Sequence, residues 1–106
     1  MSSIKELVSH QRIIDAVDAV FEAQLDFTTA LVQFPSVRGQ EGTCQDFLHD
    51  AYRARGYSVD RWKIDPQEIE HHAGFSPIDV SYEQAINVVA THRPRSQMGR
   101  SVILNG

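Results

Sequence analysis

The sequence has a single cysteine, Cys44, and no long apolar run. One cysteine cannot close a disulfide within the chain or supply a cysteine-based zinc site. No apolar stretch approaches the ~20 residues that a membrane-spanning helix requires. The N-terminus, Met1–Glu6, lacks the basic start and the apolar stretch of a signal peptide. We therefore expect a cytoplasmic protein in a reducing compartment that makes no membrane contact.

A dense cluster of basic residues is also missing, and the net charge is −4. Acidic residues outnumber basic ones in the first half of the chain, whereas the second half is nearly balanced. The one local basic group, Arg93, Arg95 and Arg100, lies around Pro94 and Gly99, which is typical of a solvated turn. Nucleic-acid binding depends on a dense basic face. We therefore expect no nucleic-acid partner.

The chain is short, with 106 residues and a mass of 12.0 kDa. Its hydrophobic fraction of 42% and charged fraction of 23% are ordinary for a globular protein. That length allows one domain with a modest core. It cannot hold a large two-domain enzyme.

A long amphipathic helix is predicted over residues 3–34. Ser3 and Glu6 have the spacing of a capping box, and Pro35 disfavours helix at the residue before it. Glutamines interrupt the apolar stripe, which leaves open a break near residues 9–11. The stripe is wider than a coiled-coil seam, so we expect it to pack on a sheet or on other helices. Its members recur every three to four residues: Leu7, Ile14, Val17, Phe21, Leu25, Thr28 and Val32.

A second helix is predicted over residues 43–55. Thr43 and Asp46 have the spacing of an N-terminal cap, and Gly56 is a natural residue to follow the last turn. The alternation of residues 57–64 predicts a strand. Residues 65–85 have no clear period and indicate a long irregular segment, with a short helical turn around residues 67–71.

Two further strands are predicted, near residues 86–91 and 101–105, either as a hairpin or as neighbours in one sheet. The run Ser101–Leu104 has too little polar alternation for a half-exposed strand and indicates a central strand covered on both faces. The predicted fold class is therefore α/β, in the order α-α-β-loop-β-β, with an incomplete sheet. Because a central strand needs neighbours on both edges, we expect residues 1–106 to be one fragment of a larger domain.

Metal-ligating side chains gather only in the segment 68–72. Glu68 and His72 would share a helical face, and Glu70 and His72 would share a strand face, whereas the adjacent His71 and His72 point apart. Two ligands do not complete a zinc site, so a solvated polar loop is the preferred interpretation. Zinc binding by Glu68, Glu70, His71 and His72 is kept as a third hypothesis.

The sequence contains no motif that indicates nucleophilic catalysis. Ser36 is not flanked as Gly-x-Ser-x-Gly, and Gly39 and Gly42 do not form a phosphate-binding loop. Cys44 is interpreted as a structural cysteine. His10 and His49 are expected at the surface, and His92 in a structural position at a strand end. From the residues alone we assign no catalytic, cofactor-binding or metal-binding residue.

Four segments, in this order, resemble a known enzyme family. They are Leu31–Gly42 (LVQFPSVRGQEG), the step from Phe47-Leu48 to Gly56-Tyr57-Ser58-Val59, the run Ile86–Ala90 and the run Ser101–Gly106. They are similar to the opening motif, the first helix-to-strand step and two strands of the zinc-dependent amidohydrolases. That family includes acetylornithine deacetylase, succinyl-diaminopimelate desuccinylase, aminoacylase and glutamate carboxypeptidase, and the first two are the nearest in pattern. The resemblance spans roughly residues 25–106.

The resemblance implies an N-terminal piece of a metal-dependent deacylase. Family members hydrolyse an amide, often on an N-acyl amino acid, with two zinc (or cobalt) ions and a glutamate base. They commonly dimerise through a smaller lid domain. The family's first metal ligand follows a strand similar to Ser101–Gly106, so we expect this fragment to hold no metal and to be inactive. Ser36, Gly39 and Glu41 match the opening motif and receive no catalytic role.

A rival hypothesis from another class is a stand-alone α/β interaction module. It would assemble through its long N-terminal helix and an open sheet edge. The features that favour it are the apolar stripe from Leu7 to Val32 and the unprotected last strand.

Overall fold

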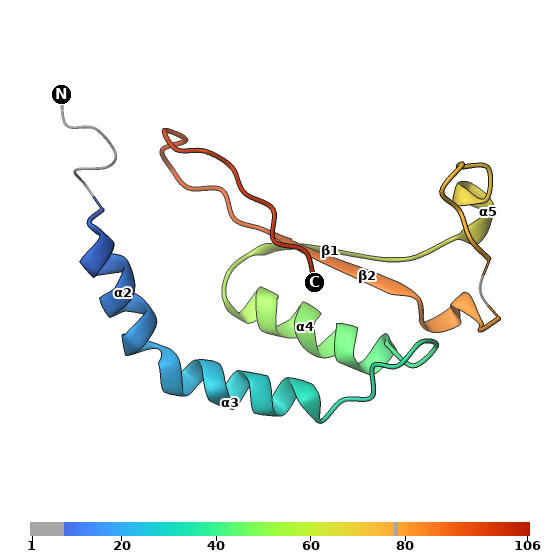
Figure 1. Ribbon diagram of the computed structural model, residues 1–106, viewed down its shortest axis with the longest axis horizontal. Coiled ribbons are helices and arrows are strands. Elements are labelled where there is room, and N and C mark those ends of the chain that lie inside the picture. The colour runs from blue at the N-terminus through green and yellow to red at the C-terminus, as the bar shows by residue number, and fades with distance from the viewer. Residues whose placement is uncertain (1–7, 78) are drawn as a thin grey trace. The chain divides into compact units, whose positions relative to one another are not determined.

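A computed structural model describes residues 8–77 and 79–106. The chain divides into two compact units, one of residues 1–28 and 93–106 and one of residues 29–92, and each is described by itself. The described residues form helices and a two-stranded antiparallel sheet (Figure 1). The protein is therefore a mixed helix-and-strand protein, which agrees with the predicted class at this coarse level.

Two helices replace the single long helix that the apolar stripe predicts. α2 covers His10–Ala19 and α3 covers Phe21–Val32. Ser9 caps α2, because its hydroxyl accepts a hydrogen bond from the backbone N–H of Arg12 at 3.2 Å. The capping pair Ser3 and Glu6 lies outside the described residues.

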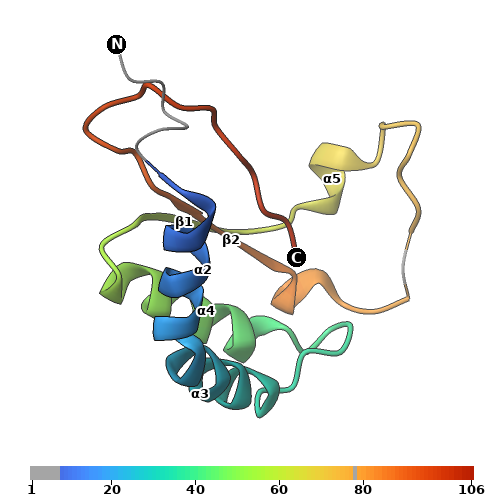
Figure 2. The ribbon, with the colours of Figure 1, turned by 60° about the vertical axis from the view of Figure 1, so that its left-hand side comes forward.

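The break between α2 and α3 falls at Val20. Its φ of −106° and ψ of 8° leave the helical region, and its N–H donates to the carbonyl of Val17 at 3.3 Å, three residues back. The chain changes direction at this tightened turn (Figures 1 and 2). No glycine or proline occurs between residues 10 and 32 to mark it in the sequence. The prediction of one helix over residues 3–34 is therefore wrong, although the open alternative of a break near residues 9–11 agrees with the start of α2.

The second unit is built around two paired strands. β1 (Ser58–Lys63) and β2 (Ile86–Thr91) are antiparallel, with Arg61 opposite Val88 and Lys63 opposite Ile86. α4 (Gly42–Ala54) contacts both strands. Among the described residues, Ile86 is the one buried hydrophobic side chain, with 8% of it exposed. The core of this unit is therefore small.

Alternation along the strands decides which side chains face α4. The side chain of Arg61 contacts α4. The residue paired with Arg61 on β2 and the residues two positions from it on β1 therefore point to the same face of the sheet. Trp62 and Val89 lie on the other face and are 43% and 46% exposed. The sheet is therefore covered on one face by α4, while the other face is open to solvent.

α4 has the predicted position, and its ends can be explained. Gly56 follows it with a φ of +82°, a conformation that glycine adopts most readily, and Arg53 lies in the last turn. The predicted cap at Thr43 is wrong. Glu41 stands at the cap position without a side-chain cap hydrogen bond, because its carboxylate accepts from the turn before the helix instead.

The segment between the strands is mostly irregular, as predicted. Asp65 caps the short helix α5 (Pro66–Ile69) by accepting from the N–H of Gln67 at 3.0 Å. Proline at the first helical position favours such a start. A single 3-10 turn, η1 (Tyr82–Gln84), precedes β2.

The strand predicted near residues 101–105 does not form. Residues 92–106 contain no helix or strand, and Val102, Ile103 and Leu104 are 79%, 91% and 90% exposed. The predicted pairing of residues 86–91 with this run is also wrong, because β2 pairs with β1. An apolar run becomes a central strand only when strands lie on both its edges, and the described residues contain just the two strands that pair with each other.

None of the helices within residues 8–77 and 79–106 combines the length and the apolar character that crossing a bilayer requires.

Candidate functional site

The turn that precedes α4 carries the motif on which the family resemblance begins. The backbone N–H of Gly39 donates to Glu41 Oε1 at 2.9 Å, and the N–H of Gln40 donates to the carbonyl of Val37 at 2.8 Å. Gly39 has a φ of +89°, a backbone angle that residues with a Cβ rarely adopt. A Cβ there would lie 3.6 Å from the Cβ of Val80, an ordinary contact. The glycine is therefore required by the backbone conformation rather than by lack of space.

Gly42 lies close to the segment that leads into β2, and Glu41 is the residue before it. Glu41 Oε2 is buried and has no hydrogen-bond partner within the described residues, while Oε1 is occupied by Gly39. Gly42 is buried, and a Cβ on it would meet the side-chain amide of Gln84. This arrangement makes Glu41 a residue that shapes the turn, since it fixes the backbone of Gly39.

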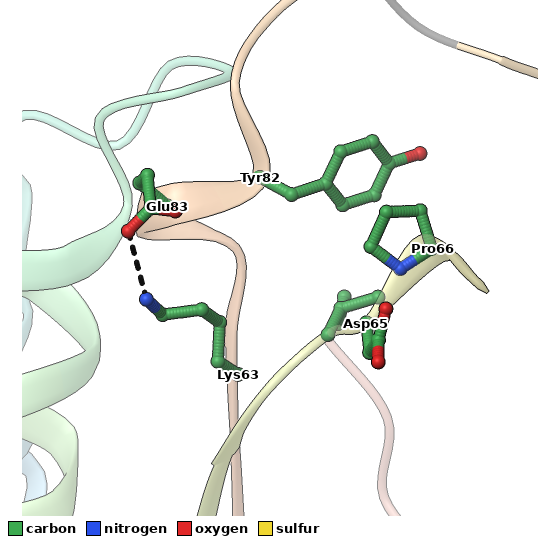
Figure 3. A pocket seen from close by; sticks show the side chains of 6 residues that line it. Lys63, Asp65, Pro66, Tyr82 and Glu83 are labelled. Atoms are coloured by element: carbon green, nitrogen blue, oxygen red, sulfur yellow. Dashed lines mark hydrogen bonds and ion pairs between the residues drawn. The ribbon is translucent and has the colours of Figure 1, made fainter. Parts of the chain in front are cut away.

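A shallow hollow of about 380 Å³ lies between the end of β1 and η1 (Figure 3). Lys63 Nζ and Glu83 Oε2, which line this hollow, form an ion pair at 2.8 Å. The Tyr82 ring lies near Pro66. The side chains of Lys63 and Glu83 are 52% and 77% exposed, so water reaches the pair. The hollow does not enclose a ligand as a typical binding pocket does.

The charged groups of this hollow already have partners. The Lys63 ammonium donates a hydrogen bond to Glu83 and attracts its negative charge, and both effects lower the pKa of the Glu83 carboxyl. The Asp65 carboxylate accepts from the N–H of Gln67. A general base needs a pKa near the working pH, so a carboxyl with a lowered pKa is poorly suited to that role.

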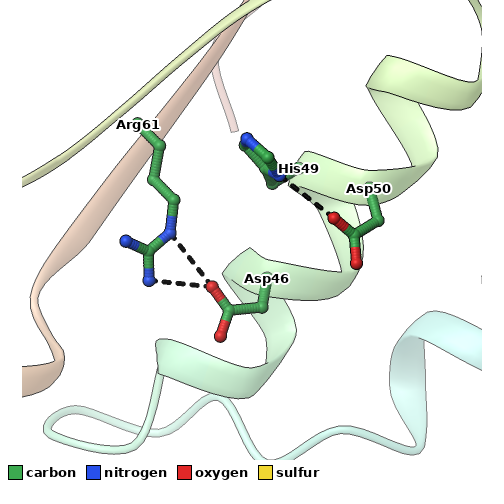
Figure 4. A network of polar contacts seen from close by, with 4 residues as sticks. All are labelled: Asp46, His49, Asp50 and Arg61. Carbon is green, nitrogen blue, oxygen red and sulfur yellow. Dashed lines mark hydrogen bonds and ion pairs between the residues drawn. The ribbon is translucent and has the colours of Figure 1, made fainter.

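A second polar cluster connects α4 with β1 (Figure 4). Arg61 Nε and Nη2 donate to the same oxygen, Asp46 Oδ1, at 3.0 and 2.8 Å. One turn further along α4, His49 Nδ1 lies 3.1 Å from Asp50 Oδ1. The His49 side chain is 23% exposed, so it is half-buried rather than fully exposed at the predicted surface position.

The pair His49 and Asp50 has one element of a catalytic dyad. A carboxylate beside Nδ1 can hold an imidazole in the orientation that a general base needs. A nucleophile must then hydrogen-bond the other ring nitrogen, and none of the hydroxyls or thiols in the described part of the chain does so. Within residues 8–77 and 79–106 the pair therefore has no nucleophile beside it to activate.

The residues considered for zinc are not brought together. α5 ends at Ile69, so Glu68 and His72 do not share the face of one helix as their spacing suggests. His71 Nε2 lies 3.7 Å from Glu70 Oε1, and the His71 side chain is 86% exposed. Across residues 8–77 and 79–106, no three His, Cys, Asp or Glu side chains gather as a metal site would require. The hypothesis of a zinc site at residues 68–72 is therefore not supported.

The other singled-out residues lie apart. His10 is exposed on α2, and His92 is exposed after β2, where its ring centre lies 5.9 Å from that of Tyr57 in an edge-to-face arrangement. Cys44 is half-buried in the first turn of α4 and is not in a disulfide. Sequence reasoning missed both ion pairs between elements, of Asp46 with Arg61 and of Lys63 with Glu83. They join residues 15 and 20 positions apart, which the packing of α4 on β1 and the turn before β2 bring together.

No family model matches this sequence, and no curated protein is significantly similar to it. The resemblance to the zinc-dependent amidohydrolases therefore depends on the four sequence segments alone. The two zinc ions that it implies have no ligand set in the described part of the chain.

Proposed function

We propose that this chain is the N-terminal portion of a metal-dependent amidohydrolase. The whole enzyme would hydrolyse an N-acyl amino acid or a similar amide, as acetylornithine deacetylase and succinyl-diaminopimelate desuccinylase do. It would be a cytoplasmic homodimer that carries two zinc or cobalt ions. Residues 1–106 alone would be inactive and would contribute scaffold rather than chemistry.

The observation that carries this proposal is the conformation of the opening motif in the turn before α4. Gly39 occupies a backbone conformation that favours glycine, and its N–H is held by Glu41. Two of the three singled-out motif residues therefore have a structural reason for their identity and spacing. Glycine is the residue that adopts this left-handed conformation most readily.

The order of elements after the motif gives further support. α4 leads through Gly56, at a φ of +82°, directly into β1, and β2 then pairs with β1. The segments that carry the resemblance at residues 47–59 and 86–90 are therefore a helix-to-strand step and a strand. Residues 101–106 have no regular structure, so this part of the resemblance depends on sequence alone.

The test is an activity assay on a protein that carries residues 1–106 at its N-terminus and continues beyond them. With zinc or cobalt added, we expect release of free amine from N-acetylornithine or N-succinyl-diaminopimelate. A panel of other N-acyl amino acids would define the preference for the acyl and amino acid parts. Absence of hydrolysis across this panel, in a folded protein with metal present, would contradict the proposal.

A second candidate, an interaction module, is favoured by the exposed apolar side chains of α2 and the start of α3. Ile13, Val17 and Phe21 are 55%, 52% and 49% exposed. Apolar patches that stay open to solvent often mark protein-protein contact sites. The outer edges of β1 and β2 offer a further route to assembly, since the described sheet has only two strands.

Light scattering after size-exclusion chromatography separates the two candidates. An interaction module predicts a monodisperse oligomer of the 106-residue chain, and Val17→Asp should convert it to a monomer. The matched control is Ala23→Asp, which adds the same charge on the same pair of helices outside the apolar stripe. A monomer, or an aggregate of undefined size, would reject the interaction module.

A further inference from the structure

We draw no further inference here: the strongest candidate, the exposed apolar face that Ile13, Val17 and Phe21 form along α2 and the start of α3, carries nothing because nothing in the structure shows what covers it.

Discussion

Arg61 on β1 and Asp46 on α4 join the helix to the sheet through one carboxylate oxygen. Both Nε and Nη2 of the guanidinium donate to Asp46 Oδ1, at 3.0 and 2.8 Å. The contact spans 15 residues of sequence and places the Arg61 side chain on the sheet face that α4 covers (Figure 4). It helps to fix the orientation of the helix that follows the opening motif.

The first prediction concerns this ion pair. Because the Arg61 and Asp46 side chains are 39% and 58% exposed, solvent screens their attraction, and the pair should contribute about 0.2–1 kcal/mol to the free energy of unfolding. A double-mutant cycle with Asp46→Asn and Arg61→Gln, followed by urea unfolding, measures this coupling.

The matched control is Asp60→Asn, on the same strand but on the opposite face of the sheet. Asp60 has no ion-pair partner within the described residues, so its substitution should change the free energy of unfolding by less than about 0.5 kcal/mol. A coupling of zero between positions 46 and 61 would show that the bridge does not hold α4.

The second prediction concerns the left-handed glycines. Gly39→Ala and Gly56→Ala should each lower the free energy of unfolding by about 1–2 kcal/mol, because φ values of +89° and +82° are strained for a residue with a Cβ. The corresponding asparagine variants should lose less, since asparagine tolerates this conformation better. Chemical denaturation monitored by circular dichroism gives the values.

Gly74→Ala provides the control for these variants. Its φ lies outside the left-handed range, and an added Cβ would meet nothing within 4 Å. Its unfolding midpoint should match that of the parent chain. Equal losses at positions 39, 56 and 74 would contradict the backbone explanation.

The third prediction concerns Ile86, which faces α4 from β2. Ile86→Val removes one buried methyl group and should lower the free energy of unfolding by about 0.5–1.5 kcal/mol. Val89→Ala, on the open face of the same strand, should cost less because Val89 is 46% exposed. The reverse ranking, measured by urea unfolding, would mean that the core does not lie between β2 and α4.

The fourth prediction concerns pH. The Lys63 ammonium lowers the pKa of Glu83 in the folded chain below its ordinary 4.5, so the unfolded chain binds this proton more readily. The stabilisation is therefore present above pH 4.5 and is lost as the pH falls through the lowered folded value. The comparison is the difference in unfolding midpoint between the parent chain and Glu83→Gln, measured from pH 7 to pH 3.

That difference should favour the parent chain at pH 7 and disappear in the acid range. Added salt should reduce it at pH 7, because both side chains are accessible to counterions. A difference that does not vary with pH would show that the Lys63 ammonium does not lower the pKa of Glu83.

The sequence predicts local features of this chain better than distant pairings. Gly56 marks the end of α4, and the alternation of residues 58–63 marks β1, because each signal is confined to a few neighbouring residues. The break at Val20 has no such marker, since no glycine or proline occurs there. The run Val102–Leu104 is apolar enough for a central strand, but whether it pairs depends on neighbours that its own residues do not specify.

The same limit applies to the polar clusters. The partners Asp46 and Arg61 are brought together by the packing of α4 on β1, and the partners Lys63 and Glu83 by the turn before β2. Neither pair has a spacing that local rules recognise. For Glu68 and His72 the opposite occurs, because their spacing suggests a shared helical face but α5 ends at Ile69.

The most direct test of the account is metal reconstitution of a protein that begins with these residues and continues beyond Gly106. After treatment with a chelator, release of amine from N-acetylornithine and N-succinyl-diaminopimelate should stop, and added zinc or cobalt should restore it on at least one of them. The 106-residue chain alone should show no activity with either metal. Hydrolysis that persists without metal, or a folded metal-loaded protein that cleaves no N-acyl amino acid, would contradict the proposed function.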